Sequence, residues 1–156
     1  MQAAANPHDH FFKQVLSDPQ VARDFVHNYL PEPVVAQLDL DTLTISAESF
    51  VDEALQAHHT DLLFTVQQQS GDDSLIYLLF EHKSYADRLV AFQLLRYMVR
   101  IWQHSLRQYE RLVPVLPVVL YHGAASWRLE PGFRWLVQGP TVFHSYTPDF
   151  EYHLCD

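Results

Sequence analysis

Two apolar runs on either side of a short polar segment stand in the middle of the sequence. Leu62–Val66 and Leu75–Phe80 flank residues 70–73, which read Ser-Gly-Asp-Asp. Short apolar runs bounded by turn residues are typical of the two strands of a β-hairpin. The second run is the more apolar one, and charged residues follow it without a break. The hairpin therefore carries charge where burial is expected to be greatest.

The charged residues of this hairpin have the pattern of a metal site. Asp61 begins the first strand, and Glu81 and Lys83 follow the second. Because successive strand residues point to opposite faces, Glu81 and Lys83 share a face and His82 points away. Two carboxylates on neighbouring strands are hard oxygen ligands of the kind that Mg²⁺ takes. The pattern predicts a phosphodiesterase site in which Asp61 and Glu81 bind the metal and Lys83 acts on the attacking water or the transition-state charge.

The same residues have a simpler interpretation. A Glu and a Lys two positions apart at a strand end often form a surface ion pair that contributes little to stability. The position of Asp61 on the partner strand strengthens the metal-site interpretation but leaves both interpretations open.

The rest of the chain supplies helices and further strands. Residues 8–31 predict two short helices, the second starting from Asp18 with Pro19 at its first position. A first strand is expected near residues 42–46, a long helix from Asp87 to about Arg111, and a buried strand within "VPVLPVVLYHG". This order predicts an α/β fold with a central mixed sheet and helices on both faces, a three-layer α/β/α sandwich.

One domain over residues 1–156 is expected. The 156 residues, 48% of them apolar and 13% aromatic, suffice for a single compact core. After Gly123 the pattern loosens into turn residues and aromatics, and the ending "DFEYHLCD" resembles a strand without a cap or a polar tail. We therefore expect the chain to be the front part of a longer protein.

The charge distribution indicates a nucleic-acid partner, although the net charge is −9. Residues 83–111 contain six basic and two acidic residues, whereas the remainder contains four basic and seventeen acidic ones. At about 100° per residue, six polar side chains of the long helix fall within an arc of about 80°. They are Gln93, Arg96, Arg100, His104, Arg107 and Arg111. Such arginines can bind DNA phosphates without reading sequence, but they could equally be the solvated face of an amphipathic helix.

Several other classes of protein are disfavoured. The single Cys155 forms no internal disulfide, and no Cys or His spacing matches a zinc site. The start of the chain has no signal-peptide pattern, and no apolar stretch approaches the roughly 20 residues of a membrane span. We expect a cytoplasmic protein that does not enter a membrane.

Four segments carry a resemblance to a known family. They are "TDLLFTV", "IYLLFEHKS", "RLVAFQLLRYMVRIW" and "LPVVLYHG". In this order they resemble the Rpn family of recombination-promoting, transposase-like nucleases, in the PD-(D/E)XK nuclease superfamily. The resemblance runs from about Asp9 to Trp127. It implies the restriction-endonuclease-like fold and metal-dependent cleavage of DNA with Mg²⁺ or Mn²⁺, linked to recombination or mobile elements.

The resemblance also implies roles for individual residues. Asp61, Glu81 and Lys83 take the two acidic positions and the lysine of the superfamily pattern. Gln93 matches a polar position that some branches use to support the site. A further acid that many relatives contribute from an upstream helix has no clear counterpart, and Glu53, with Asp52 beside it, is the nearest candidate.

Two alternatives to an active endonuclease remain open. The first is a nuclease-like module that binds DNA or a protein without cutting. The second is a fragment that is inactive alone, because a homodimer or a further C-terminal region completes the substrate groove.

Overall fold

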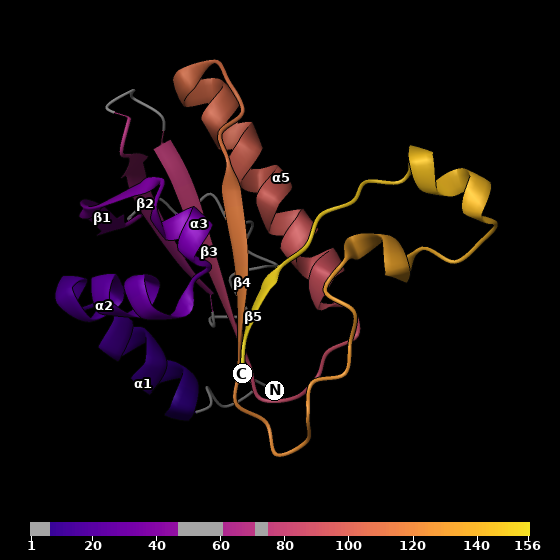
Figure 1. Ribbon diagram of the computed structural model, residues 1–156, viewed down its shortest axis with the longest axis horizontal. Helices are drawn as coiled ribbons and strands as arrows, with labels where there is room; N and C mark the ends of the chain where they lie inside the picture. Colours follow the sequence, from indigo (N-terminus) through magenta and orange to yellow (C-terminus); the bar gives the residue numbers. More distant parts are fainter. Residues whose placement is uncertain (1–6, 47–60, 71–74) are drawn as a thin grey trace, which may run out of the picture.

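A five-stranded mixed sheet forms the centre of the protein (Figure 1). The computed structural model describes residues 7–46, 61–70 and 75–156. The strands lie in sequence order, with antiparallel pairing from β1 to β3 and parallel pairing from β3 to β5. They are β1 (Leu38–Ile45), β2 (Asp61–Gln68), β3 (Leu75–Lys83), β4 (Val115–Tyr121) and β5 (His153–Cys155). The expected α/β fold with a central mixed sheet is confirmed.

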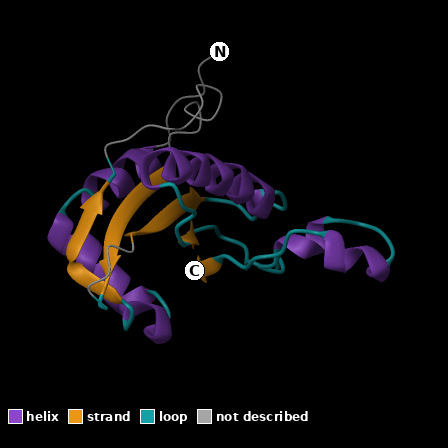
Figure 2. Ribbon diagram, turned by 90° about the horizontal axis from the view of Figure 1, so that it is seen from above, coloured by secondary structure: helices purple, strands orange, loops and turns teal. Residues whose placement is uncertain are grey.

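Helices cover both faces of this sheet (Figures 1 and 2). Helices α1 and α2 pack on one face, and α5, which connects β3 to β4, packs on the other. Two short 3₁₀ helices lie in the connection from β4 to β5, to the side of the sheet. The helices are α1 (Pro7–Leu16), α2 (Pro19–Tyr29), α3 (Glu32–Val35), α5 (Val90–Tyr109), η1 (Phe133–Leu136) and η2 (Thr141–Tyr146).

Helix α2 begins where its sequence predicts. The Asp18 side chain accepts a hydrogen bond of 2.9 Å from the Gln20 amide, and Pro19 occupies the first helical position. This arrangement satisfies an amide that would otherwise lack a partner at the helix start. Ala22 and Val26 on the inner face are buried against the sheet. A local capping signal therefore sets the start of the helix, and the sheet sets its orientation.

The predicted hairpin is formed by β2 and β3. Their register runs from Asp61 opposite Glu81 to Gln67 opposite Leu75. On β3, Leu78 and Phe80 lie in the core cluster with α1 and α2, whereas Tyr77 and Leu79 lie in the cluster with α5. Both faces of β3 are therefore buried, which explains its nearly continuous apolar sequence.

Two predicted boundaries are corrected by the structure. The sequence predicts a first strand near residues 42–46, but the strand spans Leu38–Ile45. A register shift between Asp39 and Thr44 interrupts the alternating pattern, so the first half of the strand has no clear sequence signal. The long helix was expected from Asp87 to Arg111 but spans Val90–Tyr109. Residues 87–89 form a turn instead, and the helix ends at Tyr109 because the next residue, Glu110, has a left-handed φ of 57°.

No helix in the described ranges combines the length and the apolar character needed to cross a lipid bilayer.

The last strand is held against α2 as well as against β4. Cys155 on β5 pairs with Leu120 on β4, and the His153 Nε2 atom lies 2.9 Å from the Tyr29 carbonyl oxygen. The Cys155 thiol is half-buried there, and this burial raises its pKa from 9.0 to about 11.

The reactivity of Cys155 tests this placement. Because the thiolate is the reactive form, and its fraction falls tenfold per pKa unit, we expect alkylation at pH 8 to be about a hundredfold slower in the native protein than in the unfolded one. Iodoacetamide incorporation can be followed by mass spectrometry with and without concentrated urea. Since the sequence has one cysteine, each adduct reports this site. Equal native and unfolded rates would contradict the packing of β5.

Candidate active site

Glu81 is a buried carboxylate at the end of the central strand. Glu81 as a whole is only 1% exposed, although most glutamates lie at protein surfaces. It is paired with Asp61 on β2 and with Val119 on β4, so neighbouring strands enclose it on both sides. Burial of a carboxylate is unfavourable unless hydrogen bonds and opposite charge compensate for the lost water. The residues that supply this compensation define the site.

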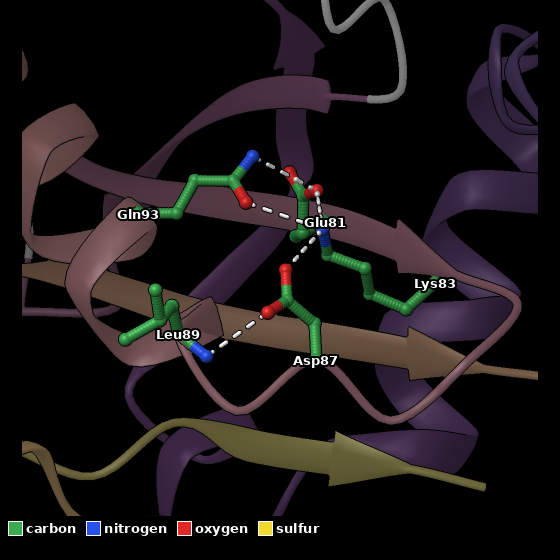
Figure 3. A network of polar contacts seen from close by, with 5 residues as sticks. All are labelled: Glu81, Lys83, Asp87, Leu89 and Gln93. Atoms are coloured by element: carbon green, nitrogen blue, oxygen red, sulfur yellow. Dashed lines mark hydrogen bonds and ion pairs between the residues drawn. The ribbon is translucent and has the colours of Figure 1, made fainter. Parts of the chain in front are cut away.

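Gln93 links Glu81 to Lys83 from the first turn of α5 (Figure 3). Its Nε2 atom donates to Glu81 Oε1 at 3.2 Å, and its Oε1 atom accepts from Lys83 Nζ at 3.1 Å. The amide can make both contacts because it carries donors on one side and an acceptor on the other. Gln93 thus fixes the carboxylate and the ammonium group relative to each other.

Lys83 lies among three oxygen acceptors. Its Nζ atom is 3.4 Å from Glu81 Oε1, 3.1 Å from the Gln93 side-chain oxygen and 3.0 Å from Asp87 Oδ2. The side chain is 11% exposed. An ammonium group has three hydrogens to donate, so these contacts match its capacity. Glu81 and Lys83 share a face of β3 as predicted, and the simple surface ion pair is excluded because both side chains are largely buried.

Asp87 is a site residue that the sequence analysis did not assign. Its Oδ2 atom accepts from Lys83, while Oδ1 accepts a hydrogen bond of 2.9 Å from the Leu89 amide (Figure 3). The second contact is the turn that an aspartate forms with the backbone two residues ahead. An aspartate immediately before a helical pattern is the signal that could have identified it. Asp87 therefore joins the start of α5 to the lysine.

The expected acids are placed to different degrees. The β2–β3 register sets Asp61 opposite Glu81, and the Asp61 side chain lies outside the described part of the structure. Glu53 and Asp52 also lie outside the described residues. Among the side chains that are described, no three His, Cys, Asp or Glu residues converge on a metal position.

The charges of the site nonetheless fit a cation. Glu81 and Asp87 contribute two negative charges against the one positive charge of Lys83. Asp61 occupies the register position opposite Glu81 on β2. The oxygen-rich donor set suits Mg²⁺ or Mn²⁺ better than a softer metal.

His82 points away from the site, as the strand alternation predicts. It is 7% exposed, and its ring centroid lies 4.6 Å from that of His122, which follows β4. The two imidazoles are therefore on the face of the sheet opposite to Glu81 and Lys83.

The arginines expected to bind DNA are all exposed on or just beyond α5. They are Arg96, Arg100, Arg107 and Arg111. Phe92 and Val99 on the same helix are 49% and 42% exposed, so the outward surface of α5 is apolar as well as basic. The sequence pattern had identified the basic residues but not these exposed apolar ones. Binding of DNA by this surface stays a prediction.

The chain is similar to a known protein family and to several named proteins. Residues 6–156 match the family described as "Putative transposase, YhgA-like". The recombination-promoting nuclease RpnD of Escherichia coli O157:H7 is 40% identical over 124 residues, which make up 78% of this chain and 47% of RpnD.

Two further relatives, both from Escherichia coli K12, are named inactive. RpnE, an inactive recombination-promoting nuclease-like protein, is 38% identical over 123 residues, 78% of this chain and 41% of RpnE. YjiP, named in similar terms, is 42% identical over 97 residues, 62% of this chain and 93% of YjiP.

The chain spans less than half the length of RpnD and RpnE. No solved structure gives a significant match. Because the family model matches nearly the whole chain, the protein is a member of the YhgA-like transposase and recombination-promoting nuclease family.

Proposed function

We propose that this chain is a metal-dependent DNA endonuclease domain of the restriction-endonuclease-like type. The observation that carries the proposal is the contact of Glu81, Lys83 and Gln93 beneath α5, with Asp61 opposite Glu81 on the adjacent strand. A buried acid and lysine two residues apart, held by a third polar group, form an organised site of the kind that phosphodiester hydrolysis requires. The names of the nuclease relatives support the same activity.

Asp61 and Glu81 are the residues that would hold Mg²⁺ or Mn²⁺. Their positions on paired strands and the excess of carboxylates over ammonium groups favour a divalent cation there. When bound, such an ion supplies a Lewis acid for the scissile phosphoryl group. Glu81 is already oriented by the Gln93 amide, so little reorganisation is needed before the substrate binds.

Lys83 is the positively charged side chain of the proposed site. Its Nζ atom lies 3.4 Å from Glu81 Oε1, the longest of its three contacts, so the hydrogen on that side can turn to a phosphate oxygen or to the attacking water near the carboxylate. Asp87 holds the ammonium group from the other side. Lys83 thus stabilises the charge that develops on the phosphate, and Asp87 and Gln93 position it.

The arginines of α5 are the proposed contacts to the DNA backbone. Gln93, which contacts Glu81, belongs to the same helix as Arg96 and Arg100. The arginines therefore extend along α5 from the end of the helix that contacts the site. The acidic remainder of the chain repels DNA, and binding is therefore expected to be weak and sensitive to salt.

A nuclease-like module that binds without cutting is the second candidate. It is favoured by the inactive names of RpnE and YjiP, which share this part of the chain. Cleavage assays on site variants distinguish the two candidates.

Plasmid nicking with Mg²⁺, Mn²⁺ or EDTA tests the endonuclease. We expect metal-dependent nicking that falls at least about a hundredfold in Asp61→Ala, Glu81→Gln and Lys83→Ala, because each loses a group that binds the metal or stabilises charge.

Matched controls are Asp149→Asn, which removes an acid from a surface ion pair with Arg134, and Lys13→Ala on α1. Thermal melts of all variants separate loss of activity from loss of fold. Nicking that persists in EDTA, or in all three site variants, would rule out this site.

Gln93 is expected to act through Glu81 and Lys83. In Gln93→Leu both amide contacts are lost, so we expect the Mg²⁺ concentration for half-maximal nicking to rise about 10- to 100-fold. Gln108→Leu, at an exposed position of the same helix, is the control. An unchanged metal requirement together with a lowered melting temperature would assign Gln93 a structural role only.

A further inference from the structure

A cavity of about 320 Å³ lies beside the start of α5, outside the group of polar contacts at Glu81. One wall is the turn that leads into the helix, with Arg88 and Leu89. The other comes from the connection between β4 and β5, which the sequence pattern left unexplained. Its side chains include Arg128, Glu130, Trp135 and Gln138. Two segments that are 40 positions apart in the chain at Arg88 and Arg128 thus form one cavity.

The cavity and the candidate active site share the turn before α5. The Leu89 amide donates to Asp87 Oδ1, and Asp87 Oδ2 accepts from Lys83 Nζ. Arg88 lies between Asp87 and Leu89 in the sequence and lines the cavity. The cavity is therefore bounded by the same turn that holds Lys83 through Asp87.

The charged side chains that line this cavity favour an anionic ligand. Arg88 and Arg128 both line it and are exposed, and within the described residues neither has an ion-pair or hydrogen-bond partner. Glu130 is the one acid in the lining, so the walls carry a net positive charge in a chain of net charge −9. Guanidinium groups bind phosphate oxygens through paired donors. A phosphate between two such groups is the ligand that this arrangement favours.

Trp135 adds an aromatic surface to the same cavity. It is 59% exposed, which is unusual for so large an apolar side chain. Its ring lies close to Gly132, where an added Cβ would come within 3.1 Å of Trp135 Cδ1, and the Arg134 guanidinium lies 5.5 Å from the ring centroid. The ring is thus supported by its neighbours while much of it remains open to a flat ligand.

We propose that this cavity binds one unpaired nucleotide of a DNA strand next to the cleavage site, with Arg88 and Arg128 on its phosphate and Trp135 stacked on its base. The proposal rests on the proposed endonuclease function. Tryptophan stacks on any base, and two arginines on a phosphate read no sequence, so the cavity recognises strand structure and not sequence. Its volume is at the lower end of the range of small-ligand sites, as one nucleotide requires. Strand ends, gaps and single strands present such a nucleotide, whereas an intact duplex does so only after unstacking.

Binding without cleavage tests the cavity. Fluorescence anisotropy in EDTA measures the affinity for a short single-stranded oligonucleotide, for the same oligonucleotide with abasic positions, and for the duplex. We expect Arg88→Ala and Arg128→Ala each to weaken single-strand binding about tenfold. Each should also reduce the slope of log affinity against log salt concentration by about one, because one phosphate contact is lost. Arg23→Gln, on α2 at the other face of the sheet, removes one charge as a control and should leave the affinity within about twofold.

The tryptophan is tested by the abasic strand. Trp135→Ala should weaken binding of the normal single strand severalfold but leave binding of the abasic strand and of the duplex unchanged. Tyr146→Ala, an aromatic residue 83% exposed on η2, is the matched control. Equal losses on normal and abasic strands would overturn the stacking role.

Plasmid nicking separates this proposal from the endonuclease itself. If the wild-type protein nicks DNA and all three cavity variants bind single strands as the wild type does, the cavity is not a nucleotide site although the nuclease stands. If no variant or wild type nicks, but single-strand binding is lost as expected, the cavity is supported and the endonuclease is not. Absence of single-strand binding by the folded wild-type protein would also overturn the cavity proposal.

Discussion

The buried carboxylate of Glu81 is the constraint on which the arrangement of β3 and α5 depends. With only 1% of the residue exposed, its charge has to be balanced by protein groups instead of water. The ammonium group of Lys83 and the amide of Gln93 do so at 3.4 and 3.2 Å. Because Gln93 comes from the helix and the other two from the strand, the helix cannot shift along the sheet without exposing an unbalanced charge. Buried polar groups that are hydrogen-bonded and paired in this way specify position more than they add stability.

The connection from β3 through α5 to β4 places this group at the end of the strands. A helix that links two parallel strands returns across the face of the sheet, so its first turn starts near the end of the strand before it. Asp87 strengthens this geometry by holding Lys83 with one oxygen and the Leu89 amide with the other. In open α/β sheets, ligands bind at the carboxyl ends of the strands. The cavity near Arg88 lies beside the same turn.

The two faces of β3 serve different purposes. Leu78 and Phe80 belong to the core with α1 and α2, and His82 continues that face toward His122. Tyr77 and Leu79 belong to the core with α5, and the polar groups of the site follow them on the same side. One strand thus carries core residues along most of its length and functional residues only at its end. Apolar packing thus holds both faces of the strand along most of its length, and the polar contacts fix the strand relative to α5 at its end.

The features that the sequence determined are local ones. The hairpin, the capped start of α2 and the common face of Glu81 and Lys83 follow from strand alternation, turn residues and capping, which act over a few positions. Contacts between distant segments were decided by the tertiary structure. The meeting of Gln93 with Glu81 was implied only by family resemblance, and Asp87 was not assigned at all, because both depend on how α5 crosses the sheet. The cavity near Trp135 had no sequence signal for the same reason: its two walls come from segments that are far apart in the chain, and only folding brings them together.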